Sequence, residues 1–373
     1  MVRRWRGRLE CVFQAPEPTD ACLAALSARA DEARQRHRLQ SKALESLIGE
    51  GALDMAEAAR QLTAEGDLNL RTMLAIAAEQ VAHEHGAAPG RCAVFGLGKF
   101  GGAEMTLGSD LDLLFVYDPS NDDLAVNAAD YFGRMAQKLT QLLVEAPDWR
   151  MAYEVDFRLR PHGEDGPLAT SLSGLKHYLS TEAWVWELQA LTRLRAIAGC
   201  ERLARETAEA ALDAMQRRCR AIDPCAEVGA MRALLEIERP ARCDWDLKLR
   251  PGGLVDIEFI VQALQLVSAK NGRPMMVANT GQALIELERA GYLSKDKARR
   301  LVGAWRLISS FRQLQSAMGV SDLSRLKGAE KAALEAMTGL SPGMARTRLL
   351  AACDRVRGLF EALVGPVEVE QAA

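Results

Sequence analysis

Hydrophobic and polar positions alternate with the period of a strand at two places along the chain. Over 111–117 the apolar side chains stand at every second position, and Asp110 and Asp112 fall on the opposite side. Over 151–160 the same alternation returns, with acidic and basic residues on the polar face. A short apolar run at 93–95 precedes a glycine-rich turn. These segments predict a small β-sheet near the middle of the chain.

Elsewhere the apolar residues recur every three or four positions, the spacing of an amphipathic helix. Before the sheet this spacing predicts helices over 20–49 and 53–85, and between its strands it predicts helices over 125–145 and 172–191. Beyond Gly199 helical patterns fill the chain, over 201–221, 226–238, 254–269, 279–290, 294–318, 327–337 and 342–364.

The expected fold class is therefore α+β and predominantly helical, a small mixed-sheet domain followed by a helical bundle. A chain of 373 residues has room for two or three domains. We expect an N-terminal helical lead-in over 1–86, the sheet domain over 87–200 and the C-terminal bundle over 201–373.

Composition and charge exclude several classes of function. A formal charge of -3 argues against a general nucleic-acid binder, which would carry a basic balance or a basic stripe. The sequence contains no apolar run near the length of about 20 residues that a membrane helix needs, and no secretory signal. Its eight cysteines form no Cys-x-x-Cys pair, so they read as reduced thiols. We expect a soluble, cytoplasmic protein.

The first candidate for chemistry is the pair Asp110 and Asp112. Two carboxylates on one side of a strand repel each other, and the pair is stable only where a cation or a proton neutralises part of the charge. Hard oxygen ligands suit Mg²⁺, with Mn²⁺ as an alternative, and Mg²⁺ commonly joins one or two carboxylates to substrate phosphates. The pair therefore favours a divalent-metal site.

The glycine-rich turn just upstream is consistent with a bound phosphate. Gly96, Gly98, Gly101 and Gly102 let backbone amides approach an anion, and Lys99 adds a positive charge. Glycines alone would equally suit a tight connection between strands. The combination with Ser-Asp-Leu-Asp-Leu on the next strand is what favours the phosphate-binding interpretation.

The alternating segment over 151–160 offers a third carboxylate, Asp156. If its strand lies beside the first, Asp156 approaches the aspartate pair, and two-metal phosphoryl transfer uses such a group of acids. Arg158 and Arg160 share its face and could neutralise developing phosphate charge. The alternative is that Asp156 and Arg158 only pair across the sheet surface.

These motifs resemble known families. The string GLGKFGGAEMTLGSDLDLLFVYD resembles the nucleotidyltransferase superfold, in which a glycine turn precedes Asp-x-Asp on a strand. Three further blocks, YEVDFRLRPHGEDGPL, EAWVWELQALTRLRAIAG and LRPGGLVDIEFIVQ, resemble the bifunctional glutamine synthetase adenylyltransferase/adenylyl-removing enzyme family in order and spacing. The resemblance runs from about residue 40 to near the end.

The resemblance implies a set of site residues. Carried over by position, the metal-binding and catalytic carboxylates are Asp110, Asp112 and Asp156. The residues near the nucleotide are Lys99, Gly101, Gly102, Ser109, Arg158 and Arg160. The chain has one Asp-x-Asp site where the family has two, so it corresponds to one half, and its blocks resemble the C-terminal, AMP-attaching half more.

What the resemblance implies about function is a Mg²⁺-dependent transfer of AMP from ATP to a tyrosine of glutamine synthetase, with release of pyrophosphate. The PII signal protein is a possible regulatory partner in this family. Two alternatives stay open, phosphorolytic removal of AMP and a non-catalytic signalling fragment. The sequence leaves open whether the chain is a fragment, where regulators bind, and which oligomer it forms.

Overall fold

A computed structural model describes residues 25, 28–35, 55–120, 125–144 and 153–367. The strands are β1 (Gly90–Gly96), β2 (Leu111–Pro119), β3 (Val155–Asp156), β4 (Ala169–Ser171) and β5 (Arg195–Gly199). The longer helices around them are α3 (Met55–His85), α5 (Ala125–Val144), α6 (Leu172–Thr181) and α7 (Val185–Leu191). Those that follow are α8 (Glu201–Cys219), α9 (Pro224–Glu238), α10 (Leu254–Lys270), α11 (Thr280–Arg289), α12 (Lys295–Met318), α13 (Ala329–Thr338) and α14 (Pro342–Leu363).

The strands form one mixed sheet in the order β3-β2-β1-β5, with β4 also paired to β2. Strand β1 runs antiparallel to β2 and to β5, whereas β3 and β4 run parallel to β2. The α+β, predominantly helical fold expected from the sequence is confirmed.

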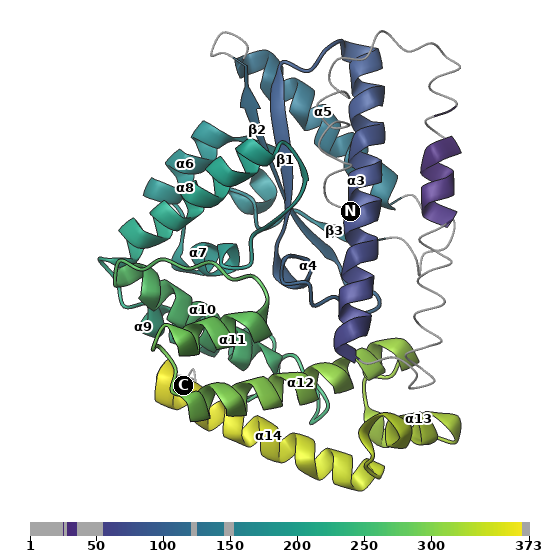
Figure 1. The fold of residues 1–373 in the computed structure, drawn as a ribbon, viewed down its shortest axis with the longest axis vertical. Coiled ribbons are helices and arrows are strands. Elements are labelled where there is room, and N and C mark those ends of the chain that lie inside the picture. Colours follow the sequence, from purple (N-terminus) through teal and green to yellow (C-terminus); the bar gives the residue numbers. More distant parts are fainter. Residues whose placement is uncertain (1–24, 26–27, 36–54, 121–124, 145–152, 368–373) are drawn as a thin grey trace.

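Helices cover both faces of the sheet (Figure 1). On one face α3 and α5 pack against the apolar side of β2 that the sequence predicts, formed by Leu111, Leu113, Phe115 and Tyr117. On the other face α6 and α8 meet Leu114 and Val116. Because β2 is buried on both sides, its run is nearly continuously apolar, as in other strands with parallel neighbours. Asp112 shares a face with Leu114, so it points to the same side as α6, α8 and the later helices.

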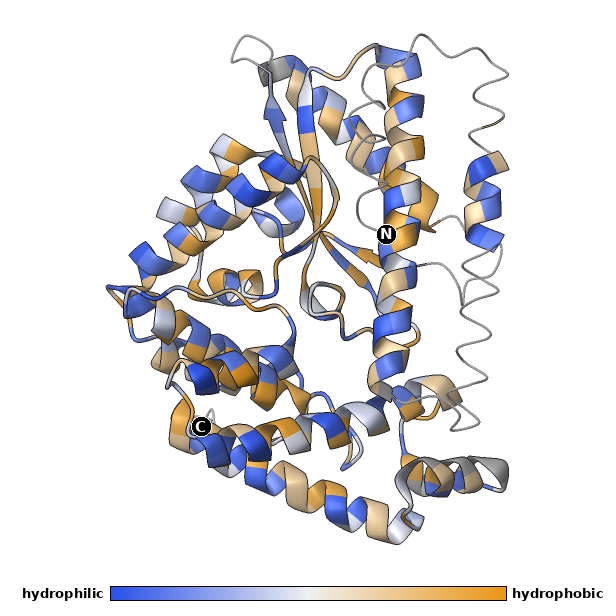
Figure 2. Cartoon of the chain, in the orientation of Figure 1, coloured by the Kyte–Doolittle hydropathy of each residue, from blue (hydrophilic) through white to orange (hydrophobic). Residues whose placement is uncertain are grey.

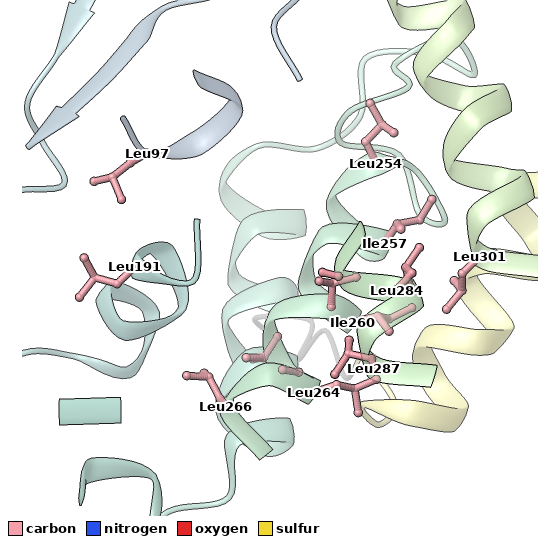
Figure 3. Close-up of a cluster of buried hydrophobic side chains, with 14 of the residues drawn as sticks. Leu97, Leu191, Leu254, Ile257, Ile260, Leu264, Leu266, Leu284, Leu287 and Leu301 are labelled. Carbon is pink, nitrogen blue, oxygen red and sulfur yellow. The ribbon is translucent and has the colours of Figure 1, made fainter. Parts of the chain in front are cut away.

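The helices after β5 pack around α10, which is buried on most of its surface. Figure 3 shows Ile257, Ile260 and Leu264 of α10 meeting Leu284 and Leu287 of α11. The same buried cluster continues into the sheet. The division into three domains stays a prediction.

The helices carry the expected amphipathic pattern. Figure 2 shows them as bands of hydrophilic and hydrophobic residues rather than as uniformly apolar rods. Among the described helices, none combines the length and apolar character that crossing a membrane requires.

Three sequence expectations need correction. The strand expected over 151–160 is only Val155–Asp156, because the chain turns directly after it, and residues 151–152 lie outside the described part. The helix expected over 172–191 breaks into α6 and α7 around Ala183. Strands β4 and β5 were not expected, since each is short and gains its hydrogen bonds only from distant partners. Most of the helix expected over 20–49 lies outside the described residues.

One buried ion pair ties the bundle together. Arg232 on α9 and Asp256 on α10 are both fully buried and lie 2.5 Å apart. Asp256 also accepts a hydrogen bond from the Gly252 amide at 2.7 Å and lies 3.3 Å from Arg357. These bonds to Asp256 join α9, the turn before α10 and α14.

We expect Arg232→Met to lower the free energy of unfolding by about 3–5 kcal/mol, because it leaves Asp256 buried with part of its charge uncompensated. The double variant Arg232→Met/Asp256→Leu should recover much of that loss. Urea denaturation followed by circular dichroism measures both. Arg134→Met, which breaks an exposed ion pair on α5, is the matched control and should leave the midpoint unchanged. Equal stability of the single and double variants would contradict this role.

Candidate active site

A turn of backbone brings glycine against a carboxylate at the end of β1. Gly98 has φ of +52°, and a Cβ placed on it would lie 1.9 Å from Oδ2 of Asp112. The Leu97 amide donates to the Asp112 carbonyl at 2.8 Å, which fixes the turn against β2. Glycine is required here both for the backbone conformation and for the close approach.

Gly101 and Gly102, which the sequence analysis expects near the nucleotide, lie against Arg193. A Cβ on Gly101 would lie 2.1 Å from the Arg193 carbonyl oxygen, and one on Gly102 would lie 2.0 Å from the Arg193 guanidinium. These two glycines let Arg193 pack against the turn. Gly98 lines the cavity beside the aspartates, whereas Gly101 and Gly102 are not among its lining residues, and the nucleotide contact expected of these two stays a prediction.

The three aspartates come together at one edge of β2. In the parallel pairing of β2 with β3, Asp112 stands opposite Asp156, and Asp110 is exposed just before β2 begins. All three line a cavity of about 520 Å³, called the cleft below, which lies between this sheet edge and helices α7, α9, α10 and α12. The expectation that Asp156 lies beside the pair agrees with the register.

The carboxylates perturb one another. Burial, followed by the charges of Asp156 and Asp110, raises the pKa of Asp112 to about 6. Burial also disfavours the charged form of Asp156, but hydrogen bonds and charge from Arg158 outweigh it and lower the pKa of Asp156. A carboxylate with a raised pKa beside two others is the arrangement that a bound cation relieves.

Arg158 forms an ion pair and a backbone hydrogen bond with Asp156. Its backbone amide donates to Oδ1 at 2.7 Å, and its Nε lies 2.8 Å from Oδ2. This is the local pairing that the sequence left open as an alternative, and it occurs inside the cleft.

In the part of the chain that the structure describes, no three Asp, Glu, His or Cys side chains are gathered as closely as a metal ion needs. The oxygen donors and the raised pKa of Asp112 nevertheless suit a hard divalent cation. Their chemistry therefore fits Mg²⁺ once Arg158 releases Asp156.

Arg160 is not part of the cleft. It is buried, and its guanidinium donates to the carbonyls of Gly166, Phe157 and Glu164 at 2.9–3.0 Å. All three guanidinium nitrogens of Arg160 thus stabilise the loop that follows β3. The chain leaves the strand after Asp156 and turns the alternating pattern away from the sheet. The phosphate contact expected of Arg160 stays a prediction.

A group of cations lines the same cleft as the aspartates and is called the cationic wall below. Its members come from the glycine turn, the segment before β5, the loop before α10 and α12, and they are Lys99, Arg193, Lys248 and Arg312. Burial, followed by the charges of Arg312 and Lys248, lowers the pKa of Lys99 to about 8. Cations crowded in this way are stabilised by an anion among them.

Ser109 also lines the cleft, as the sequence suggests. Its hydroxyl accepts from the Thr106 amide at 2.9 Å, and the Thr106 hydroxyl accepts from Lys99 Nζ at 3.3 Å. The segment between the turn and β2 is thus folded around Lys99.

Hydrogen bonds fasten the glycine turn to the bundle. Arg193 lies 2.9 Å from Glu104 and 3.6 Å from Glu258 of α10. Asn279, which caps α11, donates to the Gly102 carbonyl at 2.9 Å, and Gln313 of α12 donates to the Met105 carbonyl at 2.6 Å. The two sides of the cleft are therefore held in register at this end.

The remaining wall of the cleft is largely apolar. Trp186, Met231, Leu235 and Phe259 line it from α7, α9 and α10. Trp186 is 37 % exposed and Trp184 is 70 % exposed, so neither indole is packed in the core.

Several cleft residues are hard to find from sequence. Lys248 and Arg193 stand outside the glycine and aspartate motifs, in the segments before α10 and β5. Arg312 lies inside a regular helical pattern and carries no local signal. Arg250, two residues after Lys248, donates to the Asp244 carbonyl at 2.5 Å.

A mixed sheet whose central strand carries Asp-x-Asp after a glycine turn, with a third aspartate on the neighbouring strand, defines the nucleotidyltransferase class. Residues 13–210 match the family model for Glutamate-ammonia ligase adenylyltransferase, and residues 230–364 match that for GlnD PII-uridylyltransferase. Because the first match covers more than half of the chain, the chain belongs to the glutamate-ammonia ligase adenylyltransferase family.

Curated relatives carry the name bifunctional glutamine synthetase adenylyltransferase/adenylyl-removing enzyme. The protein from Caulobacter vibrioides is 41% identical over 76% of this chain, and the one from Bradyrhizobium diazoefficiens is 32% identical over 90% of it. The aligned regions cover 29% and 35% of those two proteins. The chain therefore spans about a third of the length of the relatives it matches.

We expect Asp112→Asn to stabilise the metal-free protein in a pH-dependent way. The folded state raises the pKa of Asp112 to about 6, so the parent loses stability as the pH rises from 4 through 6, and the variant does not. At pH 7.5 the free energy of unfolding of the variant should be about 1–3 kcal/mol higher than that of the parent protein. The difference should vanish at pH 4. Urea titrations at both pH values measure it, with the exposed Asp165→Asn as control, and a difference independent of pH would argue against this coupling.

Proposed function

We propose that this chain transfers AMP from ATP to a tyrosine of glutamine synthetase in a Mg²⁺-dependent reaction that releases pyrophosphate. Family membership supports the adenylyl group and the protein substrate. The observation that carries the proposal is the register of Asp112 with Asp156 on neighbouring strands, in one cleft with the cationic wall. The carboxylates would hold metal, and the cations would bind polyphosphate.

Asp110, Asp112 and Asp156 are the residues that would hold Mg²⁺. Bound there, the metal would neutralise charge on the triphosphate and orient it. Arg158, once released from Asp156, is free to contact the nucleotide from the same rim.

The chain's own residues would do the rest of the work. Lys99, Arg193, Lys248 and Arg312 would bind the phosphate oxygens and stabilise the charge that develops on the leaving pyrophosphate. The tyrosine oxygen forms a bond to the α-phosphorus, and the bond from that phosphorus to the bridging oxygen of the β-phosphate breaks. Once Arg158 has released it, Asp156 would receive the hydroxyl proton.

Phosphorolytic removal of AMP is the second candidate. The names of the relatives include an adenylyl-removing activity, and the same cleft would admit inorganic phosphate beside the cationic wall. An oxygen of the phosphate would form a bond to the α-phosphorus of the tyrosine-bound AMP, which gives ADP, while the bond from that phosphorus to the tyrosine oxygen breaks and the tyrosine hydroxyl regains its proton. We favour attachment because blocks around Asp156 and Trp184 resemble the AMP-attaching half.

Two further features of the proposal concern its setting. The PII signal protein is proposed as a regulator, on the resemblance to the family and the match of residues 230–364 to GlnD PII-uridylyltransferase. A cytoplasmic location agrees with the cysteines in the described ranges, which are free thiols.

The direct experiment incubates the purified chain with glutamine synthetase, Mg²⁺ and ATP labelled in its α-phosphate. We expect label on the protein and pyrophosphate in solution. Asp112→Asn and Asp156→Asn should each lower the rate by at least about 10³-fold, because each removes a carboxylate from the cluster. Asp165→Asn, outside the cleft, should retain activity. Unchanged transfer in the Asp112 variant would refute the site, and ADP formed from AMP-modified enzyme and phosphate would support removal instead.

A pair of glycine variants tests the turn. Gly98 and Gly291 both have positive φ, but a Cβ on Gly291 meets nothing within 4 Å and lies outside the cleft, whereas one on Gly98 meets Asp112. Gly98→Ala should lower the transfer rate by about 10²-fold or more, because it displaces the carboxylate. Gly291→Ala carries a similar backbone strain of about 1 kcal/mol and should keep most of the activity. Equal losses in the two variants, measured with the same assay, would count against contact between the turn and Asp112.

A further inference from the structure

A pair of buried amides lies in the wall of the cleft. Gln189 on α7 and Gln262 on α10 are 4% and 7% exposed, and both line the cleft. Nε2 of Gln189 donates to Oε1 of Gln262 at 2.7 Å. This bond joins the helix that carries Trp186 to the central helix of the bundle.

The pair leaves one acceptor and one donor unused. Oε1 of Gln189 is buried and accepts no hydrogen bond in the structure. Within the described part of the chain, Nε2 of Gln262 donates to no other residue. A buried amide oxygen without a partner is destabilising unless something else supplies the donor.

The surroundings suit a flat apolar ligand. Trp186, Met231, Leu235 and Phe259 contribute apolar side chains to the same cavity as the two amides. An aromatic ring and a polarizable thioether provide good contacts for the face of a heterocyclic base. A pocket that orients a specific ligand typically has a few polar groups surrounded by apolar side chains.

We propose that Gln189 and Gln262 recognise the adenine base of the nucleotide. Oε1 of Gln189 accepts from the 6-amino group of adenine, and Nε2 of Gln262 donates to N1. The 6-amino group lies farther from the ribose than N1 does, so it reaches Oε1 of Gln189, the more deeply buried of the two amide atoms. This inference rests on the proposed function, since it assumes that ATP occupies the cleft.

The same geometry rejects 6-oxo purines. Guanine and hypoxanthine carry an oxygen at position 6 and a hydrogen on N1, so each unused amide group would face a group of its own kind. Sites built to hydrogen-bond a particular group discriminate strongly against analogues that cannot pair there. Gln189 and Gln262 are thus specificity-determining residues rather than catalytic ones.

Calorimetric titration with ATP, GTP and ITP in the presence of Mg²⁺ tests this assignment. We expect the parent to bind ATP about 10-fold to 100-fold more tightly than ITP or GTP. ITP is the informative probe, because it shares the 6-oxo edge of GTP but lacks the 2-amino group. Gln189→Met and Gln262→Met should each reduce this preference to about threefold or less, mainly by weakening ATP.

Gln265→Met is the matched control. Gln265 lies on α10 as well and is buried, but its amide bonds to the Val277 backbone at 2.7 Å, outside the cleft. This variant should lose thermal stability and keep the base preference. If Gln189→Met does not fold, Gln262→Met decides the question.

The outcomes separate this inference from the proposed function. Equal affinity of the parent for ATP and ITP, an undiminished preference in a folded Gln262→Met variant, or no binding of any of the nucleotides would overturn the assignment. A parent that prefers ATP through these residues yet transfers no AMP to glutamine synthetase would leave the assignment intact and refute the proposed function.

Discussion

The structure is organised around one cleft that a cluster of aspartates and a group of basic side chains line together. Asp112 is held half-buried beside Asp156 by the pairing of β2 with β3, and burial together with this neighbour raises its pKa to about 6. Half-buried Lys99 lines the same cleft, and burial, followed by the charges of Arg312 and Lys248, lowers its pKa to about 8. Like charges crowded in this way are relieved by a counter-ion, a cation among the carboxylates and an anion among the basic side chains.

This cleft requires the helical bundle as well as the sheet. The aspartates come from β2, its edge and β3, whereas Lys248, Arg312 and the amide pair come from segments after residue 186. The buried ion pairs of Arg193 with Glu104 and Glu258 link the two contributions. The cleft also draws on both matched regions, 13–210 and 230–364. A piece of the chain ending near residue 210 would therefore lack Lys248 and Arg312 of the cationic wall, and Gln262 of the amide pair.

Arg158 and Arg160 illustrate how the same pattern leads to different roles. Both follow Asp156 at strand spacing, yet Arg158 stays at the cleft and Arg160 braces a loop through three backbone carbonyls. The difference arises because β3 ends at Asp156. Gly98 and Gly101 diverge in a similar way, since one approaches Asp112 and the other makes room for Arg193.

The sequence by itself determined the local elements and the acidic motif. Periodicity located the helices after Gly199 to within a few residues, and alternation separated Asp112 from the apolar face of β2, because both signals depend on neighbours along the chain. Only the tertiary structure decided that Asp156 lies in register with Asp112, that Lys248 and Arg312 line the same cleft, and that Trp186 lines this cleft instead of a core. Strands β4 and β5 belong with these, since short strands are fixed by partners far away in sequence. Contacts of that kind leave no periodic trace, because they arise from packing between segments and not within them.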